Sequence, residues 1–439
     1  MNKEMKIMDK LVQFLEKYLG PIAGRIESQR HIQSIKNGMM ALITVLMVGS
    51  LSLIISAIGG LFPKGSAIKN FFENNAQVLN LPFTFTFGLL ALYCAITISY
   101  NHAKKLEIPI AHGVVGGVLV TLILDVKIID GAMNIEYLDS RGMFVAIIGS
   151  LIAVEIMAFF IKKKITLRFE GLPEMISQTF EAIVPLATII VIAVIISVTV
   201  QNLTGGAIVP EAITKLIAPS INGVDTVWAV MLISFTEMLF WFVGLNGFAI
   251  LVGFVMPFMT QYLAENAAAY QAGTAIPHVF TPSFWDFFLA ATGSGITGAL
   301  VILSIMSKRK DLNAIGKAAA LPAMFSISEP VVFGLPIAYN PYLFIPFVFG
   351  TPLVGGFSFM VLKSGLVRAP IAQVGGIPVP LAQYLVTMDF RAVILFFVIL
   401  GLGVLMYYPF FKMYEKSLEN QDNDKDSRQK EFDALDLDF

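Results

Sequence analysis

The stretch from Ser326 to Pro336 reads SISEPVVFGLP and places one carboxylate among mainly apolar residues. A carboxylate at the centre of a membrane costs about 2.5 kcal/mol or more, so such residues usually serve a function. Pro330 and Pro336 prevent a regular helix here. Glu329, at the tip of a broken helix, could accept hydrogen bonds from sugar hydroxyls or take a proton from a hydroxyl that attacks phosphorus. Alternatively, Glu329 caps backbone N–H groups or pairs with a basic residue.

A second candidate is the segment Trp241–Gly247, with the sequence WFVGLNG, which follows Glu237 by a few residues. The ring of Trp241 could stack on a sugar, and the amide of Asn246 both donates and accepts hydrogen bonds. Equally, the segment could be an interfacial tryptophan followed by a glycine-lined helix break. Glu237 could be a site residue or a buried structural partner.

Two further polar residues are weaker candidates. His278 precedes the sequence TPSFWD and the small-residue run Gly293-Ser294-Gly295, which together are typical of a loop that re-enters the membrane. A histidine beside a proline could bind a solute or simply belong to the loop. Asn340 is followed by Pro341 at the start of an apolar run, so it could line a cavity or cap a helix.

Several kinds of chemistry have no counterpart in the sequence. It contains no phosphate-binding loop, nucleophile elbow or zinc signature, so we predict neither a cofactor nor a metal site. Cys94 is the only cysteine, which excludes an internal disulfide. The net charge of −1 argues against a nucleic-acid partner. The four histidines lie far apart in the sequence without metal-ligand spacing, at His31, His102, His112 and His278.

The composition places these residues in a membrane protein. The chain of 439 residues is 56% hydrophobic and 14% charged, and its mean hydropathy is +0.76. Soluble domains carry roughly 25% charged residues, and a membrane span needs about 20 mostly apolar residues. We therefore predict an all-α polytopic membrane protein with about ten spans. The apolar runs are Met39–Leu61, Phe83–Tyr100, Ile108–Leu124, Met143–Ile161, Ile183–Val200, Val227–Val243, Phe248–Leu263, Phe284–Met306, Tyr342–Leu362 and Val393–Met413.

The two halves of the chain differ in how many polar and helix-breaking residues their apolar runs contain. Up to about Leu203 the apolar runs contain few polar residues, whereas Gly, Pro, Asn and Glu interrupt the later ones. Interrupted hydrophobic segments indicate a solute site, because irregular backbone within a membrane must face protein or a wet cavity. We predict an N-terminal transmembrane domain at 1–205, a solute-binding domain at 206–413 and a disordered cytoplasmic tail at 414–439.

Positive charge in short loops predicts the orientation. Lys104–Lys105, Lys162–Lys164 and Lys308–Lys310 belong to loops that we expect on one side, together with the basic N-terminal segment. The acidic loop from Asp125 to Arg141 is expected on the other side. The N- and C-termini are thus predicted to be cytoplasmic. The basic residues before the first span are Lys3, Lys6, Lys10, Lys17, Arg25, Arg30 and Lys36.

The chain resembles the membrane-spanning IIC subunit of bacterial sugar phosphotransferase systems, in the lactose/cellobiose (diacetylchitobiose-like) branch. The resemblance covers essentially the whole sequence. The residues that carry the resemblance are Glu329 with its flanking Ser, Pro and Gly, the run from Asn340-Pro341 to Phe347, and Trp241–Gly247.

The resemblance implies several further properties. It implies a homodimer in the bacterial inner membrane, with two re-entrant hairpins in the C-terminal half of each subunit and dimer contacts in the N-terminal half. It also implies that the chain is the translocating subunit for a sugar, such as a β-linked disaccharide. A cytoplasmic IIB protein, itself supplied by IIA, would phosphorylate the sugar from a phosphocysteine, with Glu329 as the catalytic residue.

The sequence departs from the family pattern at two places. Asn246 stands where the family commonly has a histidine, and asparagine neither becomes cationic nor shuttles a proton. A late loop reads Pro380-Leu381-Ala382-Gln383, where an aromatic residue is common. Two other functions stay open at this point. One is an ion-coupled or facilitative sugar transporter with Glu329 or Glu237 as proton carrier, and the other is a non-transporting membrane sensor of the same fold.

Overall fold

The structure, a computed structural model, describes residues 17–18, 21–59, 62–169 and 173–434. The basic residues Lys3, Lys6 and Lys10 lie outside this part of the chain. Seven of its helices are long and apolar enough to cross a membrane, and two more apolar helices are shorter. The two short ones are α7 (Ile110–Asp125) and α11 (Val227–Phe242).

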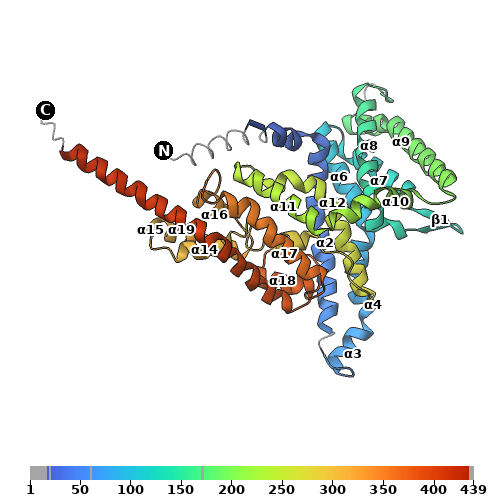
Figure 1. Ribbon diagram of the computed structural model, residues 1–439. Coiled ribbons are helices and arrows are strands. Elements are labelled where there is room, and N and C mark those ends of the chain that lie inside the picture. The colour runs from blue at the N-terminus through green and yellow to red at the C-terminus, as the bar shows by residue number, and fades with distance from the viewer. Residues whose placement is uncertain (1–16, 19–20, 60–61, 170–172, 435–439) are drawn as a thin grey trace.

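The N-terminal half is a bundle of antiparallel helices (Figure 1). Contacts of α6 with α2, α7 and α8 hold it together, and α9 packs on α7 and α8. A short hairpin of β1 (Lys127–Ile129) and β2 (Ala132–Asn134) links α7 to α8. The long helices of this half are α2 (Arg30–Gly59), α6 (Leu90–Leu106), α8 (Met143–Lys162) and α9 (Glu174–Thr204), and short helical segments, α3 (Ala67–Asn74), α4 (Ala76–Leu79) and α5 (Leu81–Thr86), precede α6.

The C-terminal half mixes long helices with broken ones. After α10 (Val209–Val224) and α11, the long helix α12 (Gly247–Gln271) packs on α2 of the first half. Between the two halves the chain turns at Gly205 and Gly206, both with positive φ. The remaining elements are α13 (Pro282–Phe284), the π-helical turn η4 (Trp285–Leu289), α14 (Gly298–Ile305), α15 (Lys310–Met324), α16 (Glu329–Gly334), the π-helical turn η5 (Pro346–Gly350), α17 (Thr351–Lys363), α18 (Val379–Thr387) and α19 (Arg391–Ala434).

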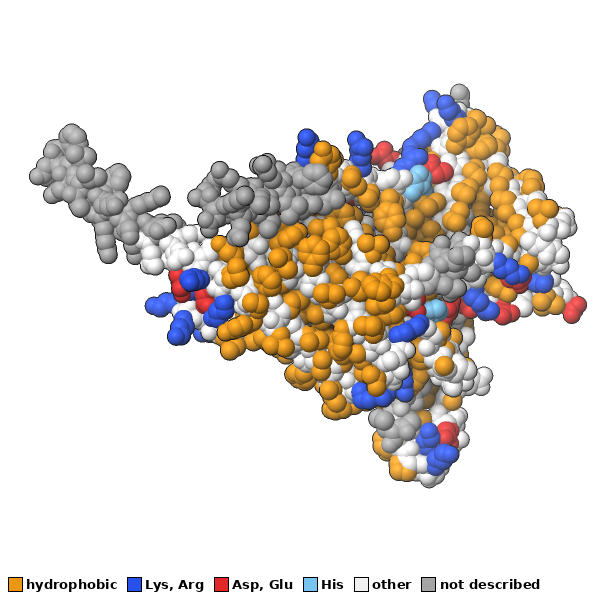
Figure 2. All heavy atoms as spheres, in the orientation of Figure 1, with side chains coloured by type: hydrophobic (Ala, Val, Ile, Leu, Met, Phe, Trp, Pro, Cys, Tyr) orange, Lys and Arg blue, Asp and Glu red, His pale blue; other side chains and the backbone are white. Residues whose placement is uncertain are grey.

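Apolar side chains cover much of the face of the molecule that Figure 2 shows. The most apolar stretch of α9 is only 17% buried, whereas that of α12 is 72% buried. On α9, Val191 and Ile195 are 56% and 58% exposed. Such a surface is unfavourable in water and suits lipid or another membrane helix. The predicted all-α membrane fold is therefore confirmed.

One of the ten predicted spans is wrong. Phe284–Met306 is not a continuous helix: a run of turns from Ala290 to Thr297 separates η4 from α14. Thr292, Gly293, Gly295 and Ile296 all have positive φ, a conformation that an α-helix cannot contain. The small-residue break expected at residues 293–295 is thus present, and it prevents the span.

The predicted disorder of the tail is also wrong for the described residues, because α19 continues to Ala434. The helix is fixed beyond the apolar run by contacts with the loop before α15. Ser307 donates to Glu415, and Arg309 pairs with Asp422 at 2.9 Å. The buried ring of Tyr414 packs against the core of the C-terminal half. The charge-rich composition of the tail is typical of disorder. Composition cannot reveal the partners at Ser307 and Arg309 that hold the helix, because these residues lie far away in the sequence.

Candidate functional site

The broken segments of the C-terminal half surround one polar cavity of about 160 Å³. Its wall combines aromatic rings, hydroxyl groups, an amide and two carboxyl groups. This mixture is characteristic of a site for a polar solute with an apolar ring face. The lining residues are Trp241, Asn246, Phe248, Trp285, Asp286, Ala290, Ser294, Ser326, Ser328 and Glu329.

The backbone breaks bring these residues together. A Cβ atom on Gly293 would lie 2.7 Å from Cβ of Ser328, so only glycine allows the turn after η4 to approach the start of α16 this closely. Gly293 also has φ 104°, which disfavours any other residue. The hydroxyl of Ser326 donates to the backbone oxygen of Asp286 at 3.0 Å. The two breaks therefore form a single wall.

Glu329 begins α16 with an exposed side chain that lines the cavity. Within the described residues, its carboxylate has neither a hydrogen-bond donor nor an ion-pair partner. The alternative roles, as a cap or as half of a salt bridge, are thus not seen. Because the acceptor oxygens are unused by the protein, they are available to hydroxyl groups of a solute.

Asn246 lines the same cavity and also caps a helix. Its Oδ1 accepts a hydrogen bond from the backbone N–H of Ala249 at 2.9 Å, at the start of α12. The cap fixes the amide and leaves its NH₂ group to donate. Trp241, at the end of α11, is 4% exposed and lines the cavity beside it.

Glu237 lies behind the cavity wall rather than in it. It is 1% exposed, and its Oε1 accepts a hydrogen bond from the hydroxyl of Ser294 at 3.1 Å. A Cβ atom on Gly247 would lie 2.3 Å from the backbone oxygen of Glu237, so α11 and the start of α12 touch at this level. Glu237 therefore contacts the lining through Ser294.

Asp286 and Gln373 were not singled out as site residues from the sequence. The side-chain amide of Gln373 donates to Oδ2 of Asp286 at 3.0 Å, although the two residues are 87 positions apart. Gln373 lies in the irregular segment between α17 and α18, without helix or strand. The local signal for Asp286 was its acidic side chain in an apolar run, within the stretch already expected to re-enter the membrane.

His278 is not part of this cavity. Its Nε2 lies 2.7 Å from Oε2 of Glu265, and its Nδ1 lies 3.3 Å from Oδ2 of Asp225. Lys363 pairs with the same Asp225 oxygen at 3.1 Å. Burial alone lowers the pKa of His278, but the hydrogen bonds and charges of Asp225 and Glu265 outweigh burial and raise it to about 9. His278 therefore holds the loop before α13.

Asn340 is also outside the lining. It is 7% exposed, and its Oδ1 accepts a hydrogen bond from the backbone N–H of Tyr342 at 3.0 Å. This bond closes a turn ahead of η5, so the structure shows neither of the two roles considered for Asn340. Three of the six predicted site residues, Trp241, Asn246 and Glu329, thus meet in one cavity, and Glu237 lies just behind it.

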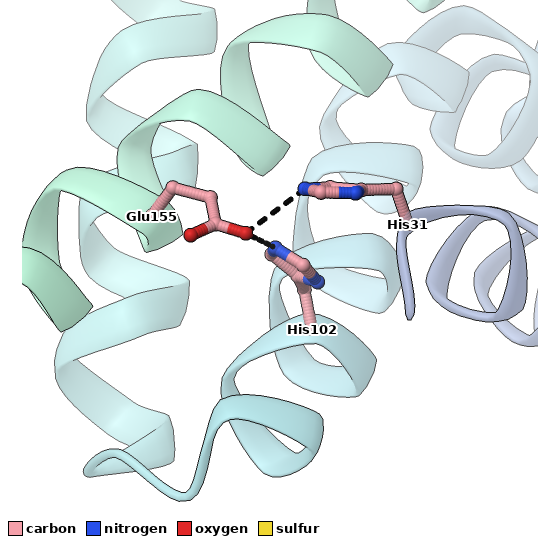
Figure 3. Close-up of side chains that lie close together, drawn as sticks. All are labelled: His31, His102 and Glu155. Atoms are coloured by element: carbon pink, nitrogen blue, oxygen red, sulfur yellow. Dashed lines mark hydrogen bonds and ion pairs between the residues drawn. The ribbon is translucent and has the colours of Figure 1, made fainter. Parts of the chain in front are cut away.

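A second polar cluster was not predicted from the sequence, because its two histidines and its glutamate lie far apart along the chain. His31, His102 and Glu155 converge from α2, α6 and α8 (Figure 3). Oε1 of Glu155 lies 2.9 Å from Nε2 of His31 and 3.2 Å from Nε2 of His102. The side chains of His31 and Glu155 are about one-third exposed, so the cluster has access from outside.

The hydrogen bonds around this cluster explain it as an ion-pair network. Arg30 already occupies Oε1 of Glu155 at 2.9 Å. Gln29 uses its amide oxygen to cap Ile32, so its NH₂ group donates to Nδ1 of His31 at 2.8 Å. The proton of His31 is then on Nε2 and points at Glu155, which leaves that nitrogen without a lone pair for a metal ion. The cluster joins three helices.

The helices around an irregular polar cavity define the class of the protein, which is a polytopic membrane transporter. Residues 36–351 match the family described as "Phosphotransferase system, EIIC". The chain is 30% identical to the lichenan permease IIC component of Bacillus subtilis (strain 168), over 95% of this chain and 96% of that protein. It is 28% identical to the lactose-specific EIICB component of Lacticaseibacillus casei, over 93% of this chain and 72% of that protein.

A solved structure has the same fold. The crystal structure of the transporter ChbC, the IIC component of the N,N'-diacetylchitobiose-specific phosphotransferase system, matches with a TM-score of 0.84 and 26% identity. The match covers 93% of this chain and 99% of that one. This chain belongs to the EIIC family of the phosphotransferase system, and it is a sugar permease that works with a IIB partner. Membership of this family does not favour the two alternatives left open by the sequence, an ion-coupled or facilitative transporter and a non-transporting sensor.

Proposed function

We propose that the chain binds a β-linked disaccharide in the cavity between Trp241 and Glu329 and moves it across the membrane for phosphorylation. The relatives are named for lichenan, lactose and N,N'-diacetylchitobiose, which are all β-linked saccharides. The observation that carries the proposal is the unpaired Glu329 carboxylate in a cavity that also contains two tryptophan rings. Carboxylates accept hydrogen bonds from sugar hydroxyls, and indole rings stack on sugar faces.

The proposed chemistry needs one proton acceptor from this chain. A sugar hydroxyl attacks the phosphorus of a phosphocysteine on IIB, an O–P bond forms, the S–P bond breaks, and the cysteine leaves as a thiolate. Glu329 takes the proton that the hydroxyl loses. Cys94 is fully buried in α6, which makes it inaccessible to a cytoplasmic phosphoryl donor. In the proposed mechanism a IIB partner supplies the phosphoryl group, and IIA recharges it.

We further propose a homodimer that uses the N-terminal half, with residues 206–413 as the transport domain. The exposed apolar face of α9 supports this, because a partner helix could cover it. A cavity of about 630 Å³ between α8 and α9 has mostly Ile, Leu and Phe in its wall, so it suits lipid or a packed side chain better than sugar. In the proposed topology both termini lie on the cytoplasmic side of the bacterial inner membrane, as the basic loops predict.

Membrane vesicles test the proposed function. Inside-out and right-side-out vesicles with the full chain receive a radiolabelled β-linked disaccharide, with phosphorylated or unphosphorylated IIB on the cytoplasmic side. We expect sugar phosphate on that side only with phosphorylated IIB. Glu329→Gln should reduce it strongly, whereas the exposed control Glu419→Gln should not. Accumulation of free sugar, indifferent to IIB, would contradict group translocation.

A further inference from the structure

The charges in the cavity wall all have one sign. Two lining residues are titratable, Asp286 and Glu329, and both are acidic. Among the lining residues there is no Lys, Arg or His to balance them. Glu237 adds a third carboxyl group just behind Ser294. A solute in this cavity therefore meets two acidic groups and no compensating cation among the lining residues.

The neighbours of Asp286 fix it as a hydrogen-bond acceptor. The hydroxyl of Ser283 lies 2.5 Å from both the backbone oxygen of Ala372 and Oε1 of Gln373, which places the Gln373 side chain beside η4. The NH₂ group of Gln373 donates to Oδ2 of Asp286, 3.0 Å away. Oδ1 of Asp286 has no hydrogen-bond partner within the described residues. Gln373 is 2% exposed, so packing holds this arrangement firmly.

We propose that Asp286 is a specificity-determining residue that makes the cavity reject anionic sugars and accept neutral or amino sugars. Asp286 disfavours any ligand with a carboxylate or phosphate group, and it favours one with an ammonium group. The inference rests on the proposed sugar-binding function and names the charge class of substrate for that same site.

The same charge acts on the product. A sugar phosphate carries up to two negative charges close to Asp286 and Glu329, whereas the incoming sugar carries none. Electrostatic repulsion inside a protein is weakly screened, so like charges in one cavity cost much more than in water. Asn246 cannot offset this repulsion, because its amide stays uncharged where a histidine could become cationic. The phosphorylated product is therefore bound more weakly than the substrate and leaves.

Three matched ligands and the product test the proposal on the purified full chain. They are a neutral β-linked glucose disaccharide, its uronic-acid form, its 2-amino form and its 6-phosphate. Binding is measured by titration calorimetry at about pH 6, where the amino group keeps its proton and the carboxylate is ionised. We expect the uronic acid and the phosphate to bind about tenfold or more weakly than the neutral sugar, because like charges repel in the cavity. The amino sugar should bind at least as tightly as the neutral one.

Two variants make the cavity less negative. Asp286→Asn removes a negative charge while its amide oxygen still accepts from Gln373. Asn246→His adds a group that is mostly cationic at about pH 6. The control Asp130→Asn lies in the exposed β1–β2 turn, at φ 49°, which asparagine tolerates. The affinity ratio of neutral to anionic sugar should fall at least about threefold in either cavity variant and stay constant in the control.

The outcomes separate this inference from the proposed function. If none of the four ligands binds, the proposed function fails and the inference falls with it. If the neutral sugar binds and the wild-type chain binds the uronic acid equally well, the inference alone is overturned. It is also overturned if both cavity variants fold, as judged by thermal unfolding, and keep the wild-type affinity ratio. A smaller ratio in folded Asp286→Asn supports it, and Asn246→His shows that added positive charge moves the ratio in the same direction.

Discussion

The backbone N–H of Gln373 donates a hydrogen bond to the hydroxyl of Ser50 at 2.8 Å. Because the side-chain amide of Gln373 also donates to Asp286, a single residue contacts both the cavity wall and α2. Gly375 supports the same contact, since a Cβ atom there would lie 3.2 Å from Cε of Met47. The segment behind the cavity thus rests on the first long helix of the N-terminal half. Any movement of the cavity relative to α2 must break this bond.

Removing the Ser50 hydroxyl should destabilise the fully buried junction. Ser50→Ala leaves the Gln373 N–H without an acceptor, which costs about 1–3 kcal/mol. The thermal unfolding midpoint in detergent should fall accordingly. Ser56→Ala, one to two turns further along α2, is the matched control, because its hydroxyl is half-buried and its hydrogen bond to Asn80 is long at 3.4 Å. Equal decreases in the unfolding midpoint for the two variants would show that the Ser50–Gln373 hydrogen bond does not contribute more to stability than the Ser56–Asn80 one.

Glu329→Gln should weaken sugar binding because an amide is a poorer acceptor than a carboxylate. Hydrogen bonds to charged groups contribute about 1.5–3 kcal/mol, so we expect a roughly tenfold to hundredfold rise in Kd for the neutral disaccharide. Calorimetry on the purified chain measures this change. Glu419→Gln on α19 serves as the control, since its side chain is exposed. An unchanged affinity for Glu329→Gln would remove this residue from the site.

The helical part of the fold follows from the sequence to a large extent. Long apolar runs predict spans because a helix satisfies its backbone hydrogen bonds within the membrane. The exception is Phe284–Met306, whose break depends on the positive φ angles around Gly293 and Gly295. Glycine permits such angles but does not require them, so sequence alone could indicate the break without deciding it.

The site could be predicted only where its residues cluster along the chain. Trp241 and Asn246 are five positions apart, and Glu329 stands out as a carboxylate directly before a proline in a mainly apolar stretch. The pair of Asp286 and Gln373 joins residues 87 positions apart, which no local pattern encodes. For His278, the sequence left a binding role and a loop role open, because its carboxylate partners lie elsewhere in the chain.

A substitution at Glu237 tests whether this buried carboxyl group carries a coupling proton. Glu237→Gln keeps an oxygen that accepts from Ser294 but cannot take up and release a proton. Because Glu237 lies behind the lining, we expect the Kd for the neutral disaccharide to change less than about threefold, or 0.6 kcal/mol. Formation of sugar phosphate in vesicles should persist with a protonophore present. Uptake that the variant and the protonophore both abolish would instead favour a proton-coupled transporter.

The ion pairs of His278 make the stability of the protein dependent on pH. Their partners raise the pKa of His278 from 6.5 to about 9 in the folded chain. A raised histidine pKa stabilises the folded state fully below about pH 6.5, and the contribution disappears as pH rises through 9. The shift corresponds to at most about 3 kcal/mol.

His278→Gln should therefore lower the thermal unfolding midpoint most at about pH 6, and the difference from wild type should shrink towards about pH 10. The glutamine retains hydrogen-bonding capacity but cannot neutralise Asp225, which is left with Lys363 as its cationic partner among the described residues. Unfolding scans across this pH range in one detergent measure the difference. Gln271→Ala, at the exposed end of α12, has no titratable group and should give an offset that is independent of pH. If the His278→Gln difference were equally constant across the range, charge on His278 would not be what stabilises the loop before α13.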